Sequence, residues 1–91
     1  MKFKAGFYYL SEDISGETKD YYDNPELAWK ELMSIVESIG IESSLLGDIP
    51  GTVNADNDVK GPQDNDPNIT RECTGVRNKE KMFVYMREYS D

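Results

Sequence analysis

The 91-residue sequence predicts a single α+β domain, spanning residues 1–91, with a small, mostly antiparallel sheet of three or four strands and one amphipathic helix packed on a face. Two observations support this prediction. Stretches near both ends of the chain alternate apolar and polar residues as strands do, and one stretch between them repeats apolar residues with the helical period.

The first strand is expected over residues 2–10. Phe3, Ala5, Phe7 and Tyr9 alternate with the other residues of this stretch, so we expect these four side chains to face the core. Residues 11–23 are polar and contain several acids, and they predict a connection.

The helix is expected to begin at Pro25, because proline suits the first turn and either Asp23 or Asn24 can cap the free amides before it. Gly40 is suited to the left-handed conformation that ends a helix. The buried stripe is predicted to contain Ala28, Leu32, Ile35, Val36 and Ile39, widened by Trp29 and Met33.

The chain after the helix is less regular. Residues 41–49 predict either a short strand or a turn of helix that buries Leu45, Leu46 and Ile49. Residues 50–68 lack apolar periodicity and predict a long acidic loop or a loose hairpin, a kind of segment that in compact domains is often functional or disordered.

Two further strands are expected near the end of the sequence. Residues 69–74 predict one strand, and Gly75 and Asn78 predict the turn that follows it. Residues 81–89 predict the last strand, with apolar residues on both faces, which favours a central or doubly covered position. One face carries Met82, Val84 and Met86, and the other carries Phe83, Tyr85 and Arg87.

The charge is unevenly distributed. The whole chain has 10 basic and 18 acidic residues and a net charge of −8, whereas residues 11–66 alone carry fourteen acids against three bases, a net charge of −11. This acidity argues against direct binding to nucleic acid or to anionic lipid, and favours a basic protein partner.

The residues that usually carry catalysis or bind metals are scarce. The sequence has no histidine, and its one cysteine, Cys73, lacks an obvious activating neighbour, so we expect no enzyme and no cofactor. A calcium loop starting at Asp56 would place Lys60 at a ligand position and Pro67 where a bidentate Glu is needed, so we expect no metal. The single cysteine, the absence of a signal peptide and the lack of a long apolar run predict a cytoplasmic protein without a membrane span.

In its size, acidity, Asp/Glu-rich loops and lack of catalytic residues, the chain resembles the phage-encoded DNA-mimic inhibitors, which include anti-restriction and some anti-CRISPR proteins. The resemblance implies a protein that blocks the nucleic-acid site of a host defence protein, often as a homodimer. It rests on no shared motif and assigns no residue a role.

The acidic region suggests which side chains would contact such a partner. The candidate electrostatic contacts are Glu12, Asp13, Glu17, Asp20, Asp23, Asp48, Asp56, Asp58, Asp64 and Asp66, and the candidate aromatic anchors are Tyr21 and Tyr22. The tyrosines can equally fill the edges of the core.

An alternative function is a structural or assembly module. In that case the acids serve only solubility, and a sheet edge or the face bearing Phe83 and Tyr85 associates with a partner or a second copy.

Overall fold

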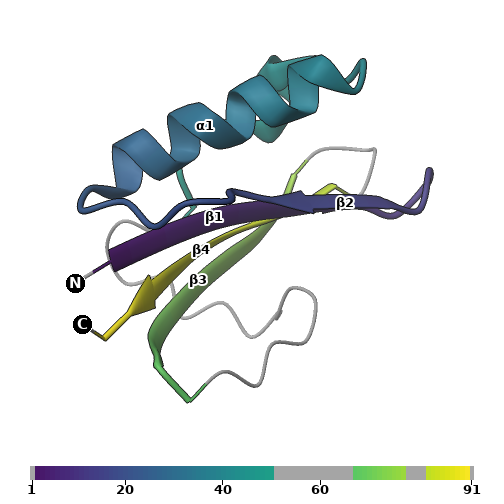
Figure 1. Cartoon of the computed structure of the whole chain (residues 1–91). Helices are drawn as coiled ribbons and strands as arrows, with labels where there is room; N and C mark the ends of the chain where they lie inside the picture. Colours follow the sequence, from purple (N-terminus) through teal and green to yellow (C-terminus); the bar gives the residue numbers. More distant parts are fainter. Residues whose placement is uncertain (1, 51–66, 78–81, 91) are drawn as a thin grey trace.

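A computed structural model of the chain describes residues 2–50, 67–77 and 82–90 (Figure 1). Four strands form an antiparallel sheet in the order β2-β1-β4-β3, and helix α1 lies across one face of it (Figure 1). The elements are β1 (Lys2–Tyr9), β2 (Ile14–Glu17), α1 (Pro25–Ser38), the short 3₁₀ helix η1 (Ser43–Leu46), β3 (Ile69–Arg77) and β4 (Met82–Tyr89). The predicted α+β class is confirmed.

The core lies between the sheet and α1, where the alternation of β1 predicts it. Ala5 and Phe7 are fully buried, and Phe3 and Tyr9 pack against the core from the same face of the strand. β4 pairs with β1 on one side and β3 on the other, so its predicted central position is also confirmed. Val84, opposite Phe7 in the register, is fully buried beneath the helix.

Local sequence signals define both ends of α1. The Asn24 side chain accepts a hydrogen bond from the backbone N–H of Glu26 at 2.7 Å, which satisfies one free amide of the first turn. Gly40 has a φ of 89°, the left-handed conformation that is expected after the last turn. The predicted stripe is wrong at Ile39, which caps the C-terminal end and is 45% exposed, because the helix ends before its next turn could reach the sheet.

The predicted connection over residues 11–23 contains a strand, β2, and the prediction is corrected there. Its sequence, ISGE, has only one good strand former, so its pairing with β1 is imposed by tertiary contacts. Gly16 leaves room for the Phe7 ring, since a Cβ at this position would lie only 2.8 Å from Cε1 of Phe7.

The turn predicted at Gly75 is also wrong. Gly75 lies inside β3 and pairs with Val84 of β4, so the strand extends to Arg77. A glycine weakens a strand only modestly, and here the neighbouring β4 supplies the pairing that overrides the local signal. Asn78, the other residue of the predicted turn, lies outside the described residues.

Of the two alternatives for residues 41–49, the helical turn is observed. η1 buries Leu46 completely, and Leu45 and Ile49 are partly buried against the core. The loop or hairpin predicted for residues 50–68 falls almost entirely outside the described residues.

Candidate functional site

The turn between β1 and β2 carries two of the predicted acids, Glu12 and Asp13, and both are exposed. Asp13 has a φ of 51°, a conformation that aspartate tolerates better than most residues. Its Oδ1 accepts a hydrogen bond from the Tyr8 hydroxyl at 2.9 Å, and this bond, together with the carboxylate charge, raises the pKa of Tyr8. Asp13 is thereby tied to β1, while Glu12 stays exposed beside it.

Glu17, the third predicted acid, takes part in a polar cluster on the sheet face opposite α1. Its carboxylate accepts hydrogen bonds from the Tyr85 hydroxyl at 2.8 Å and from Nη1 of Arg87 at 3.0 Å, and Oε1 lies 3.6 Å from Nζ of Lys4. Burial, followed by the charge of Glu17, raises the pKa of Tyr85. Glu17 is therefore engaged inside the fold.

Arg87 is the centre of this polar cluster and is only 2% exposed. Its Nε donates to Glu72, and its guanidinium carbon lies 4.1 Å from the centroid of the Tyr85 ring. Burial acts to lower the pKa of Arg87, but the hydrogen bond with Glu72 and the electrostatic interactions with Tyr85, Glu72 and Tyr89 raise it overall. Among the described residues of the cluster, the two cations Arg87 and Lys4 thus balance the two carboxylates Glu17 and Glu72.

Asp20 and Asp23 lie just before α1 and are exposed. Tyr21, between them, is 48% exposed, with its ring 4.4 Å from Nζ of Lys4 and edge-on to Tyr89 at a centroid distance of 5.1 Å. Of the two predicted aromatic anchors, Tyr21 is the one with substantial free surface.

Tyr22 contributes to packing. Its backbone exchanges two hydrogen bonds with Phe3, at 2.7 and 3.0 Å, and its ring packs against the core. Its hydroxyl donates to a carboxylate oxygen of Glu31 on α1, which raises the pKa of Tyr22 to about 12. Tyr22 therefore fastens the segment before the helix to both β1 and α1.

The remaining predicted acids follow α1 in sequence. Asp48 is exposed just after η1, and Asp56, Asp58, Asp64 and Asp66 lie outside the described residues. The exposed acids that precede the helix fall into two groups. Glu12 and Asp13 belong to the β1–β2 turn, which lies near the C-terminal end of α1 (Figure 1), whereas Asp20 and Asp23 directly precede its N-terminal end.

Sequence reasoning overlooked the acids at the C-terminal end of α1. Glu37 lies in the last turn, Glu42 follows Gly40, and both are exposed. A helix C-terminus carries a partial negative charge and usually attracts basic residues, yet the last turn of α1 has none. Glu37 and Glu42, acids at a helix end where basic residues are preferred, were the sequence signal that could have identified this site.

These acids border a hollow of about 320 Å³ between the hairpin turn and the end of α1. Two aliphatic side chains at this end of the molecule are unusually exposed, Leu10 at 46% and Ile39 at 45%. The hollow is lined by Tyr9, Glu12, Ile14, Ile39, Gly40, Ile41, Glu42 and Leu45. It therefore combines an apolar floor with carboxylates at its border.

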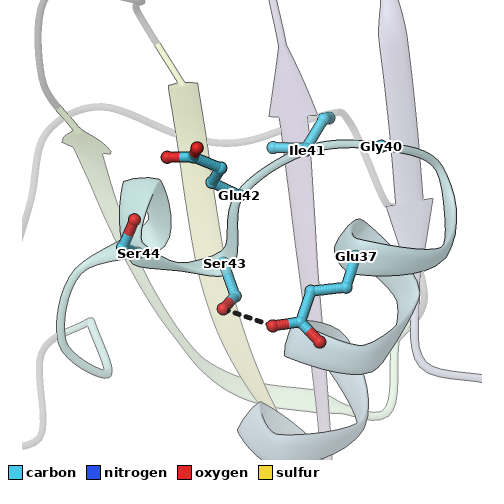
Figure 2. Close-up of a pocket in the computed structure, with 6 residues that line it drawn as sticks. All are labelled: Glu37, Gly40, Ile41, Glu42, Ser43 and Ser44. Atoms are coloured by element: carbon cyan, nitrogen blue, oxygen red, sulfur yellow. Dashed lines mark hydrogen bonds between the residues drawn. The ribbon is translucent and has the colours of Figure 1, made fainter.

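A second hollow, of about 410 Å³, lies along the segment that joins α1 to η1 (Figure 2). Its carboxylates are Glu37 and Glu42, and the Ser43 hydroxyl donates a hydrogen bond to Oε1 of Glu37 at 2.7 Å (Figure 2). Gly40, Ile41 and Glu42 line both hollows. We call this end of the molecule, formed by Leu10, Glu12, Glu37 and residues 39–45, the acidic end.

The acidic end carries several negative charges. Among the described residues, no ion pair engages Glu12, Glu37 or Glu42. Their charges add to the negative end of the helix dipole, and they stand beside exposed aliphatic carbons. Such a surface suits a ligand that combines positive charge with an apolar group.

Within the part of the chain that the structure describes, no three His, Cys, Asp or Glu side chains are grouped to hold a metal ion, and Cys73 is buried. No helix there is long and apolar enough to cross a membrane. No protein-family model, curated protein or solved structure matches the chain.

Proposed function

We propose that the protein is a non-enzymatic binding protein that occupies a positively charged, nucleic-acid-binding surface of a host defence protein and inhibits it as a DNA mimic. One observation carries the proposal: the fold places its acids outward. Residues 2–50 carry eight exposed acids and three exposed bases, a net exposed charge of −5. The exposed acids are Glu12, Asp13, Asp20, Asp23, Glu26, Glu37, Glu42 and Asp48, and the exposed bases are Lys2, Lys19 and Lys30.

The internal ion pairs leave this excess uncompensated. Lys4 and Arg87 pair with Glu17 and Glu72 in the polar cluster, so these two cations are not available to offset the exposed carboxylates. Because the pairs engage two carboxylates as well as two cations, the acidity of the outward surface comes from the composition of residues 2–50, which contain ten acids and four bases. A positively charged groove that normally binds phosphates would attract these exposed carboxylates by the same electrostatic force that attracts DNA.

The separation of the acids is also compatible with a phosphate backbone. The 14 residues of α1 span about 21 Å, and acids stand at both ends of the helix. Along the axis of duplex DNA each strand contributes one phosphate per about 3.4 Å, so this span corresponds to about six base pairs of axial length.

The alternative of an assembly module receives less support in the form that uses the face bearing Phe83 and Tyr85. Tyr85, one of its two predicted contact residues, is 3% exposed and engaged with Glu17 and Arg87. Phe83 is the only one of the two with appreciable exposed surface.

The test captures the partner and asks whether DNA competes for it. The immobilised chain is incubated with a lysate of cells that express it, at about 50 mM and about 500 mM NaCl, because phosphate-like contacts weaken steeply with salt. Duplex DNA should release the captured protein at a lower charge concentration than polyglutamate does, and the free chain should inhibit the captured protein's DNA binding in a gel-shift assay.

Charge-reversed variants test whether the acids before α1 contribute to the electrostatic attraction. Asp20→Lys with Asp23→Lys should reduce capture at low salt, whereas Asp20→Asn with Asp23→Asn should reduce it less. Capture that is insensitive to salt, or a captured protein whose DNA binding the chain leaves unchanged, contradicts the proposal.

A further inference from the structure

The acidic end leaves aliphatic surface exposed. Ile39 and Leu10 are about half exposed, whereas Leu46, only a few residues further along, is completely buried. Ile39 also lines the 320 Å³ hollow. Ile14 lines it too, and it packs against the core. Exposed aliphatic groups that border a hollow are typical of a surface that binds an apolar side chain.

The charge around the hollow indicates what accompanies that side chain. Glu12 and Glu42 come from different elements and both line the hollow, and Glu37 stands on the adjoining one. Like charges at one end of the molecule repel each other, and the negative end of the α1 dipole increases their potential. A bound cation relieves this repulsion, so the complementary ligand is basic as well as apolar.

The backbone at this end is fixed before any ligand binds. The N–H of Ile41 donates to the carbonyl of Val36 at 2.9 Å, and that of Gly40 donates to the carbonyl of Glu37 at 3.1 Å. The hydrogen bond from Ser43 to Glu37 ties the same segment to the helix. A preorganised site loses less conformational entropy on binding than a mobile one.

We propose that the hollow binds a short basic segment of the partner protein, in which one aliphatic side chain enters the hollow and the flanking Lys or Arg side chains pair with Glu12, Glu37 and Glu42. This inference rests on the proposed function and adds to it the chemistry of the partner segment. The aliphatic side chains that line the hollow, among them Ile14, Ile39 and Leu45, offer contacts to an entering aliphatic side chain.

The test uses the ¹⁵N-labelled full chain and a capped synthetic peptide, Arg-Lys-Ile-Lys-Arg. Amide shifts should move at Glu12, at residues 39–42 and at Leu45, and should saturate with added peptide. Two control peptides separate the contributions: Arg-Lys-Ser-Lys-Arg lacks the aliphatic group, and Gln-Gln-Ile-Gln-Gln lacks the charge. Each should bind at least about fivefold more weakly.

Matched variants test the location. Ile39→Ser should weaken the Arg-Lys-Ile-Lys-Arg peptide about fivefold, whereas Leu27→Ser, on the same helix and 51% exposed, should leave its affinity unchanged. Glu42→Lys should weaken it about fivefold at low salt, and Asp20→Lys, which changes the net charge equally, should have a much smaller effect.

The inference is overturned if the three peptides bind alike, if the shifts map to Asp20 and Asp23, or if Ile39→Ser has no more effect than Leu27→Ser. It is also overturned if sedimentation shows a dimer that Ile39→Ser dissociates, because a second copy then covers the hollow. Capture that is salt-sensitive and displaced by DNA, despite any of these outcomes, leaves the proposed function standing and removes only the hollow as its contact.

Discussion

Tyr22 shows how one side chain joins three parts of the fold. Its backbone bridges to Phe3, its ring packs against the core, and its hydroxyl donates to Glu31 on α1. Because the hydrogen bond is lost when the phenol ionises beside a carboxylate, the folded state holds the Tyr22 proton more tightly than the unfolded state does.

This contact predicts a loss of stability in strong alkali. The pKa of Tyr22 is raised from 10.0 to about 12. The contribution is therefore complete below pH 10 and is lost as the pH rises from about 10 to about 12, where only the unfolded chain ionises readily. Titration of ¹³Cζ-labelled tyrosine by NMR should give a midpoint near 12 for Tyr22, and Glu31→Gln should lower it. A midpoint near 10 in both proteins contradicts the role of Glu31.

At the scale of elements, the Tyr85 ring of β4 lies directly over Gly6 of β1. The two residues are partners in the register, and a Cβ at Gly6 would lie 2.0 Å from Cζ of the Tyr85 ring. The ring cannot simply move aside, because Glu17 and Arg87 hold it. Position 6 therefore requires glycine, because the Tyr85 ring of the polar cluster occupies the space that a side chain would need.

Gly6→Ala should lower the free energy of unfolding by about 1–3 kcal/mol, the usual range for overpacking. Urea denaturation followed by circular dichroism measures the change. In a Tyr85→Ala background the same substitution should have a much smaller effect, because its clash is absent. An equal loss in both backgrounds would place the cause elsewhere.

How far the elements could be predicted from sequence depends on where their stabilising contacts lie. α1 was predictable because Asn24, Pro25 and Gly40 carry its end signals within one short stretch. β2 was not, because its four residues contain one good strand former and the pairing comes from β1. Local patterns describe elements that local interactions fix, and they miss those that a neighbouring strand imposes.

The same distinction applies to the site. The sequence identified the acidic region correctly as a property of composition, but it could not separate Glu17, which pairs with Arg87 70 positions away, from exposed Glu12. Nor could it bring Glu12 and Glu42, thirty positions apart, to one hollow. Both facts depend on strand and helix packing that no sequence window contains.

At the scale of the whole molecule, the net charge of −8 and the eight exposed acids of residues 2–50 predict self-repulsion in the folded state. Raising NaCl from about 10 mM to about 200 mM shortens the range of that repulsion and should raise the melting temperature. If screening relieves about 1 kcal/mol, the rise is about 4–8 °C for a domain of this size.

The control for this prediction reduces the charge without touching the described residues. Asp56, Asp58, Asp64 and Asp66 are replaced together by Asn, which brings the net charge to −4, and the salt dependence measured by circular dichroism should become flatter. A melting temperature that falls as salt is added would show instead that exposed ion pairs stabilise the fold.

The position of β4 has a consequence for how the protein is made. β4 lies in the middle of the sheet, between β1 and β3, although the ribosome synthesises it after every other element (Figure 1). Until it emerges, β1 has no neighbour on one side, and Phe7 and the apolar face of α1 have no Val84 or Met86 to pack against. A nascent chain therefore cannot close this core until β4 has emerged from the ribosome and paired with β1.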